Sequence, residues 1–335
     1  MMQKNTMGRV TASSFQAPKW AKNRHVQTIF PRFFQKRKAL SIKWEKLSLP
    51  DGDFTDLAWG PIPTESKGLI VLFHGLEGCV RSHYANDLMA SLTENGWQTV
   101  MMHFRGCSGK PNATTRAYHS GDTADALHFL AKLQQDYPTT PKCAVGVSLG
   151  GNMLLKLLGE TPYEHGLKAA IAISSPLKLD ECSMTMNQGF SKVYQKHLLK
   201  NMKRNLKKKM AILDYSSAIT LGVNEVDSIT NFKAFDDAVT APLHGFDSAD
   251  DYYQKCSGFQ FLKAIQCPTL ILHAKDDPFM NEKVIPKDED LSNYVSVELS
   301  ENGGHVGFLQ GTPWRPSIWL HQRVAQFFTQ QVIKE

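Results

Sequence analysis

Apolar runs and segments with helical periodicity alternate along most of the chain. Residues 84–95 and 122–137 place apolar side chains on one side at helical spacing, and a further helix is expected after residue 148. Continuous apolar runs, which are typical of strands buried on both faces, occupy 68–75, 98–104, 142–147, 169–175 and 267–274. Strands that alternate with helices form parallel sheets covered on both faces. The pattern therefore predicts an α/β fold with a mostly parallel sheet.

The pattern changes in three places. Residues 40–59 alternate between apolar and polar side chains and predict a hairpin at the sheet edge. Residues 1–39 are basic and irregular, and they predict an extension that packs across the domain through Trp20, Ile29, Phe30, Phe33 and Phe34. Residues 177–262 interrupt the sheet pattern without a convincing strand. We therefore expect one α/β domain, 1–335, with residues 177–262 inserted in it as a helical cap.

A serine follows the run at 142–147. It is the centre of Gly146-Val147-Ser148-Leu149-Gly150, between an expected strand and an expected helix. A serine at such a sharp turn adopts strained backbone angles, and the residues two positions away must be small for the chain to fold back. The hydroxyl then projects from the carboxyl edge of the sheet, where the N–H of Leu149 can stabilise an oxyanion. The alternative for this motif alone is an ordinary tight turn.

A second glycine-rich turn follows the strand expected at 68–75. Its residues are His74-Gly75-Leu76-Glu77-Gly78. Glycines directly after a buried strand let backbone N–H groups turn toward a ligand, which makes the Leu76 N–H the second oxyanion donor. The alternative is an ordinary strand-to-helix turn. His74 adjoins this turn and is expected near the site in a structural role.

An acid and a histidine follow later strands. Asp276 and Asp277 come directly after the run at 267–274. His305 follows an alternating stretch at 295–299 and two glycines. The order Ser, Asp, His is typical of α/β-hydrolases, in which the imidazole accepts the serine proton and the carboxylate fixes the imidazole tautomer. Asp277 lies where the acid usually lies, with Asp276 as the alternate, and only one of the two should reach His305.

Composition narrows the functional class. With 335 residues, 42% of them hydrophobic and 21% charged, the chain is typical of a soluble globular protein. Its net charge of +6 is far below that of a nucleic-acid-binding domain. The six cysteines show no Cys-x-x-Cys pair and no metal-finger spacing, and no signal peptide or run of 18 apolar residues is present. We expect free thiols, a cytoplasmic location, no nucleic-acid partner, and neither a metal nor an organic cofactor.

Motifs from near residue 20 to near residue 310 resemble one family. Together they are similar to the YheT-like family of α/β-hydrolases, which is related to the eukaryotic abhydrolase-domain lipid hydrolases. The matching stretches are Asn23-Arg24-His25-Val26-Gln27-Thr28, His74-Gly75-Leu76-Glu77-Gly78, Gly146-Val147-Ser148-Leu149-Gly150-Gly151-Asn152, Phe235-Asp236-Asp237, Thr240-Ala241-Pro242, Gly245-Phe246, Asp276-Asp277-Pro278-Phe279 and Gly303-Gly304-His305. The resemblance implies hydrolysis of carboxylic esters, with acyl transfer to alcohols in some relatives.

The combined prediction is a serine hydrolase that cleaves small-molecule carboxylic esters. A preference for apolar acyl chains rests on the resemblance and on the Leu, Met and Phe residues of the expected cap. One alternative is an acyltransferase with the same triad, in which an alcohol replaces water. Another is a non-catalytic binding protein on the same fold, although all the triad residues are present. A nucleotide-binding site is excluded because residues 146–151 do not form Gly-x-Gly-x-x-Gly.

The expected cap contains a basic stretch at 196–209. Four apolar residues recur there every four positions, on one face of a helix: Leu198, Met202, Leu206 and Met210. Seven basic residues accompany them, with no acid between Cys182 and Leu213: Lys196, Lys200, Lys203, Arg204, Lys207, Lys208 and Lys209. One interpretation is a cap helix whose charges meet solvent. The other is a helix that makes peripheral contact with an anionic membrane surface.

Overall fold

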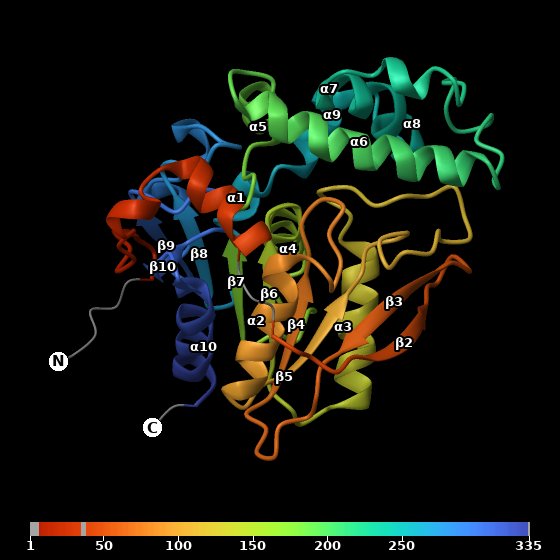
Figure 1. The fold of residues 1–335 in the computed structure, drawn as a ribbon. Helices are drawn as coiled ribbons and strands as arrows, with labels where there is room; N and C mark the ends of the chain where they lie inside the picture. The colour runs from red at the N-terminus through yellow and green to blue at the C-terminus, as the bar shows by residue number, and fades with distance from the viewer. Residues whose placement is uncertain (1–6, 35–37, 334–335) are drawn as a thin grey trace.

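A mostly parallel sheet forms the centre of the computed structural model, which describes residues 7–34 and 38–333 (Figure 1). The strands are β1 (Val10–Ala12), β2 (Lys43–Ser48), β3 (Phe54–Trp59), β4 (Leu69–Phe73), β5 (Gln98–Met102), β6 (Lys142–Val147), β7 (Ala169–Ile173), β8 (Thr269–Ala274) and β9 (Val295–Ser300). Within the described residues they form one sheet in the order β1-β9-β8-β7-β6-β4-β5-β3-β2. Neighbours run parallel except at the β2–β3 and β3–β5 pairs. The predicted α/β class is therefore confirmed.

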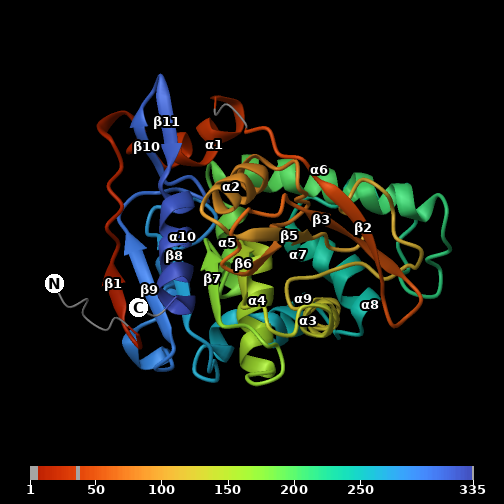
Figure 2. The ribbon, with the colours of Figure 1, turned by 90° about the horizontal axis from the view of Figure 1, so that it is seen from below.

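The central strands divide the core into two layers. Because successive side chains of a strand face opposite sides of a sheet, the odd-numbered residues of β4 pack on one face and the even-numbered ones on the other. Helices α3 (Ala124–Asp136) and α4 (Leu149–Glu160) cover the first face. Helices α2 (His83–Glu94) and α10 (Trp319–Val332) cover the second, so the sheet lies between two helical layers (Figure 2).

The N-terminal segment differs from its prediction. The hairpin expected at 40–59 is present as β2 and β3, but residues 1–39 are not irregular throughout. Strand β1 pairs in parallel with β9, and residues Arg24–Phe34 form helix α1. A strand of three residues is too short to leave a periodic signal. Helix α1 does place Val26, Ile29, Phe30 and Phe33 at helical spacing, and this pattern was missed beside the helix-breaking Pro31.

The expected anchors of this segment behave differently from one another. Trp20 and Phe30 are partly buried against the core, and Ile29 is half-buried. Phe33 is 68% exposed because it lies in the last turn of α1, so its prediction as an anchor is wrong. The Phe34 side chain lies outside the described residues, as do residues 1–6 and 35–37. The predicted packing of the extension across the domain therefore holds for Trp20 and Phe30.

The segment between β7 and β8 folds into helices over the carboxyl ends of the central strands (Figure 1). These helices are α5 (Leu179–Met186), α6 (Ser191–Met210), α7 (Phe232–Phe235), α8 (Ala241–His244) and α9 (Ala249–Cys256). The segment has an apolar cluster of its own, in which Leu199 and Leu206 of α6 pack with Tyr215. The apolar pattern did not predict two later features of the chain. One is the hairpin formed by β10 (Leu309–Thr312) and β11 (Arg315–Ile318), and the other is helix α10.

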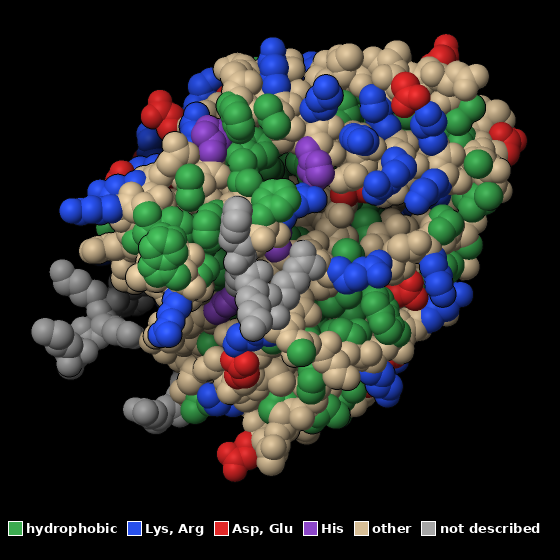
Figure 3. Space-filling view, viewed as in Figure 1, with side chains coloured by type: hydrophobic (Ala, Val, Ile, Leu, Met, Phe, Trp, Pro, Cys, Tyr) green, Lys and Arg blue, Asp and Glu red, His purple; other side chains and the backbone are tan. Residues whose placement is uncertain are grey.

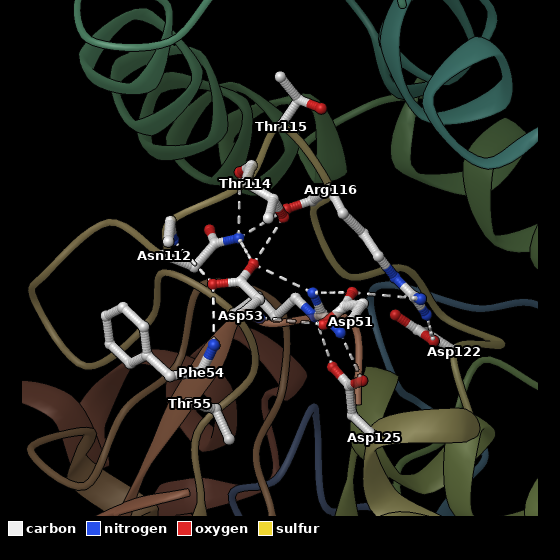
Figure 4. A network of polar contacts seen from close by, with 12 residues as sticks. Asp51, Asp53, Phe54, Thr55, Asn112, Thr114, Thr115, Arg116, Asp122 and Asp125 are labelled. Atoms are coloured by element: carbon white, nitrogen blue, oxygen red, sulfur yellow. Dashed lines mark hydrogen bonds and ion pairs between the residues drawn. The ribbon is translucent and has the colours of Figure 1, made fainter. Parts of the chain in front are cut away.

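A buried ion network fastens the loop between β5 and α3 to the β2–β3 turn (Figure 4). The Arg105 guanidinium pairs with three carboxylates: Asp51 at 2.7 Å, Asp53 at 3.0 Å and Asp125 at 2.6 Å. Burial raises the pKa of Asp53, but hydrogen bonds from Thr114 and Asn112 outweigh it and hold this pKa below its ordinary value. The same loop carries Tyr118 and Ser120, so the network fixes part of the surface beside Ser148.

Candidate active site

Ser148 lies at the turn between β6 and α4. Its backbone angles are φ 51° and ψ −119°, a region that non-glycine residues occupy only when the surrounding structure holds them there. A Cβ at Gly146 would lie 2.4 Å from the carbonyl oxygen of Gly150, and a Cβ at Gly150 would lie 2.4 Å from the carbonyl oxygen of Phe73. The two flanking glycines are therefore required by close backbone approach, as the motif predicts.

The structure brings together Ser148, His305 and Asp277. His305 Nε2 lies 3.0 Å from Ser148 Oγ, and His305 Nδ1 lies 2.9 Å from Asp277 Oδ2. The Asp277 side chain is 1% exposed, and its Oδ1 accepts the Phe279 N–H at 2.8 Å. The Phe279 ring stacks on the imidazole with centroids 3.9 Å apart. With the Nδ1 proton donated to Asp277, Nε2 is free to accept the Ser148 hydroxyl proton.

Asp276 points to a different group. Its Oδ1 accepts the backbone N–H of Gly304 at 2.9 Å, and its Oδ2 lies 3.4 Å from Asn302 Nδ2. Burial raises the pKa of Asp276, and the Gly304 N–H partly offsets this effect. As expected for adjacent residues, only one of the two aspartates reaches the imidazole, and it is Asp277 that does so.

The loop that carries His305 is held in a strained conformation. Gly304, Val306 and Phe308 have φ angles of 56°, 61° and 45°, and Val306 and Phe308 are residues for which this region is costly. Side chains from other parts of the chain accept the backbone N–H groups of this loop. Asp276 accepts the N–H of Gly304, and Thr28 accepts that of His305 at 3.0 Å. Ser174 accepts the N–H of Val306 at 3.2 Å, and Gln27 accepts that of Leu309 at 2.7 Å. These contacts place the imidazole opposite Ser148.

Gln27 and Thr28 are site-supporting residues that sequence reasoning did not assign. They belong to the Asn23–Thr28 motif, which stands out in the sequence only through the resemblance to the YheT-like family. Gln27 is fully buried, and a Cβ at Gly307 would lie 2.2 Å from its carbonyl oxygen. The sequence offered one signal for Gln27, a polar residue within a short amphipathic helix. A polar side chain that such a helix buries is nearly always hydrogen-bonded to a specific partner.

The two expected oxyanion donors lie in the same pocket as Ser148. Leu76 and Leu149 both line it, and a Cβ at Gly75 would lie 3.2 Å from the Ser148 Cβ. Within residues 7–34 and 38–333, neither the Leu76 N–H nor the Leu149 N–H has a hydrogen-bond acceptor. Two residues that line the pocket beside Ser148 thus have backbone N–H groups with no acceptor in the described part of the chain.

His74 supports the Leu76 turn from below. It is fully buried, its Nε2 accepts the Phe104 N–H at 3.0 Å, and its Nδ1 donates to the Gly75 carbonyl at 2.7 Å. Burial lowers the pKa of His74 to about 3, so the ring is neutral at physiological pH. Its contacts tie the turn after β4 to the end of β5, which is a structural role.

The pocket beside Ser148 is mainly apolar. It encloses about 780 Å³, including the open space at its mouth. Its apolar walls come largely from the segment between β7 and β8, through Leu179, Met186, Leu198, Met202 and Phe232. A more polar cavity adjoins it and shares Leu76, Tyr118, Met202 and Thr240 with it. The arrangement can hold an apolar chain next to the serine hydroxyl.

The described residues contain neither a cluster of metal-binding side chains nor a helix that could span a membrane. No group of three or more His, Cys, Asp or Glu side chains in this part of the chain is arranged to hold a metal ion. None of the helices in residues 7–34 and 38–333 combines the length and the apolar composition needed to cross a lipid bilayer.

Known proteins resemble this chain in sequence and in fold. Residues 68–312 match the family model described as alpha/beta hydrolase fold. "Putative esterase YheT" of Escherichia coli (strain K12) is 46% identical over 309 residues, 92% of this chain and 90% of that protein. "Phospholipase ABHD3" of Mus musculus is 26% identical over 333 residues, 97% of this chain and 80% of that protein.

Solved structures agree on the fold. The Pyrococcus furiosus esterase Pf2001 matches with a TM-score of 0.58 and 14% identity, over 96% of this chain and 98% of that one, a likeness that concerns the fold alone. The predicted resemblance to the YheT-like family is confirmed by the identity to YheT and the extent of the family match. The chain therefore belongs to the alpha/beta hydrolase fold family, as a member of its YheT-like group of enzymes.

Proposed function

We propose that this protein is a serine hydrolase that cleaves carboxylic esters. The observation that carries the proposal is the hydrogen-bond chain from Ser148 Oγ through His305 to Asp277. A serine hydroxyl is a poor nucleophile until a base takes its proton, and an imidazole serves as that base when a carboxylate orients it. The names of two relatives, "Putative esterase YheT" and "Phospholipase ABHD3", support the same reaction class.

In the proposed reaction, Ser148 Oγ attacks the ester carbonyl carbon while His305 Nε2 takes the hydroxyl proton. Asp277 stabilises the imidazolium that forms, and the N–H groups of Leu76 and Leu149 donate to the oxyanion. His305 then gives its proton to the leaving alcohol, and the acyl group remains on Ser148. Water attacks this acyl-enzyme with His305 again as the base, which releases the carboxylic acid and restores the serine.

Residues 177–262 are proposed to act as a cap that shapes the acyl site within a single domain, 1–335. The apolar walls that this segment contributes to the pocket support the proposal. Burial of each methylene group contributes about 0.8 kcal/mol, so ester affinity should rise with acyl length until the pocket is filled. A relative from Saccharomyces cerevisiae, 26% identical over 271 residues, is named a monoacylglycerol lipase, and monoacylglycerols are acyl esters.

The proposed partner is a small-molecule ester, and the proposed chemistry requires no cofactor because the triad supplies the nucleophile and the base. A cytoplasmic location stays a prediction. The six cysteines, all with free thiols in the structure, support it.

The proposal is tested by labelling the full chain with a fluorophosphonate and by measuring hydrolysis of p-nitrophenyl esters from acetate to palmitate. Ser148→Ala should abolish labelling and lower turnover by about 1,000-fold or more, whereas the exposed Ser217→Ala is the matched control and should change neither. Undiminished labelling of Ser148→Ala would contradict the assignment of the nucleophile. Ethyl esters formed in the presence of ethanol would indicate acyl transfer, and an unlabelled wild-type chain without turnover would indicate a binding protein.

A further inference from the structure

Five basic side chains form a row along the outer face of α6. They are Lys192, Lys196, Lys200, Arg204 and Lys208, and all five are exposed. Each step of four residues turns by about 40° around a helix, so the five charges wind across the solvent-exposed side of α6. None of the five takes part in an ion pair within the described residues. We call these residues the α6 basic row.

The other lysines of α6 have partners within the protein. Lys203 Nζ binds the carbonyl oxygens of Asp227 and Ile229, at 3.0 and 2.9 Å. Lys207 pairs with Asp227 at 2.6 Å. Lys209 is 8% exposed and binds the carbonyl oxygen of Arg116 at 2.9 Å, and burial lowers its pKa to about 8. The basic stretch seen in the sequence therefore contains a set with partners in the protein and an exposed set, of which Arg204 and Lys208 also border the polar cavity.

The inner face of α6 is mostly apolar and is already covered. Leu198 and Met202 line the pocket beside Ser148, and Leu199 and Leu206 are buried in the cluster with Tyr215. The helix is therefore a wall of the pocket, and its apolar face is not free to insert into another body. Any partner of α6 must meet the basic row.

Exposed apolar side chains lie beside the first half of the α6 basic row. Phe33, Phe190 and Val193 are 68%, 51% and 55% exposed. Helix α1 is fixed against α6 there, since Arg32 Nη1 lies 3.0 Å from His197 Nε2 and the His25 and Phe190 rings are 4.4 Å apart. Lys and Arg side chains gather along α6 on this face of the molecule, with hydrophobic side chains next to them (Figure 3).

We propose that the α6 basic row and the side chains of Phe33, Phe190 and Val193 dock the protein peripherally on an anionic lipid bilayer. Exposed positive charges are attracted to anionic headgroups, and apolar side chains beside them gain by entering the headgroup region. Apolar side chains would gain nothing comparable on a nucleic-acid backbone, and the net charge of +6 is small for such a partner. Docking in this way turns one wall of the pocket toward the lipid. The contact is independent of the proposed ester hydrolysis.

The test measures binding of the full-length Ser148→Ala chain to sedimenting vesicles, so that turnover plays no part. Neutral phosphatidylcholine vesicles are compared with vesicles that also contain phosphatidylglycerol. The row variant carries Lys196→Gln, Lys200→Gln and Lys208→Gln. Its charge-matched control carries Lys43→Gln, Lys168→Gln and Lys263→Gln, three exposed lysines outside α6.

The chain with an unchanged α6 basic row should bind the anionic vesicles more tightly than the neutral ones at low salt. It should lose this preference at high salt. Each basic residue near a charged surface strengthens binding about five-fold, so the row variant should bind about 100-fold more weakly while the control is unchanged. Phe33→Ser with Val193→Ser should weaken whatever binding remains at high salt. Equal binding to neutral and anionic vesicles, an equal loss in the control, or tighter binding to a duplex oligonucleotide than to vesicles would each overturn the proposal.

Discussion

Substitution of the adjacent residues Asp276 and Asp277 distinguishes a carboxylate that takes part in the reaction from one that only positions the His305 loop. Asp277 accepts the His305 Nδ1 proton at 2.9 Å, whereas Asp276 accepts the Gly304 backbone N–H at 2.9 Å. Substitution by asparagine preserves the shape of each side chain and removes only its charge. In Asp277→Asn, the amide NH₂ can donate to Nδ1, which moves the imidazole proton to Nε2 and leaves no base for Ser148.

The expected effects differ by orders of magnitude. Asp277→Asn should lower kcat by about 10,000-fold, equivalent to about 5.5 kcal/mol in the barrier. Asp276→Asn retains an amide oxygen that still accepts the Gly304 N–H. It weakens one charge-assisted hydrogen bond by about 1 kcal/mol, so kcat should fall about five-fold or less. Asp276→Ala removes the acceptor of the Gly304 N–H altogether. Its loss of kcat should lie between those of Asp276→Asn and Asp277→Asn.

Steady-state kinetics with a p-nitrophenyl ester and the rate of fluorophosphonate labelling should report the same order. The exposed Asp214→Asn is the matched control and should leave both rates unchanged. Thermal unfolding of each variant separates a loss of folding from a loss of chemistry. A larger loss in Asp276→Asn than in Asp277→Asn would refute the assignment of Asp277 as the acid partner of His305.

Three further predictions concern residues around the site. Thr28→Val keeps the side-chain shape but removes the acceptor of the His305 N–H, and should lower kcat about five-fold with little change in KM. Arg105→Met removes the cation that three carboxylates share and should lower the free energy of unfolding by about 3–5 kcal/mol, measured with denaturant. Burial raises the pKa of Asp236 to about 6, so the folded chain holds this proton more tightly than the unfolded chain does. The contribution of Asp236 to the free energy of unfolding is therefore full below the ordinary pKa of an aspartate. It falls by about 2–3 kcal/mol in all as the pH rises through about 6. In Asp236→Asn, thermal-unfolding scans should no longer show this fall.

Local sequence determined the alternating architecture and the order of the candidate triad. Apolar runs with the period of buried strands correspond to β4 to β8, because burial on both faces requires continuous apolar side chains. The glycines around Ser148 follow from sterics within a few residues of the turn. Since parallel strands end at one edge of a sheet, residues that follow β6, β8 and β9 could be expected to meet there.

Only the tertiary structure decided which side chains support that site and which face outward. Whether Asp276 or Asp277 reaches His305 depends on how the turn after β8 is rotated, which no period in the sequence records. Thr28 acts on a loop 277 positions away, through a contact that exists only once α1 is packed. The lysines of α6 look alike in sequence, yet Lys209 is buried against a distant loop while Lys208 is exposed. The periodicity of a sequence shows which side of a helix or strand is buried. The side chains that pack against that side come from residues far away along the chain, and periodicity does not identify them.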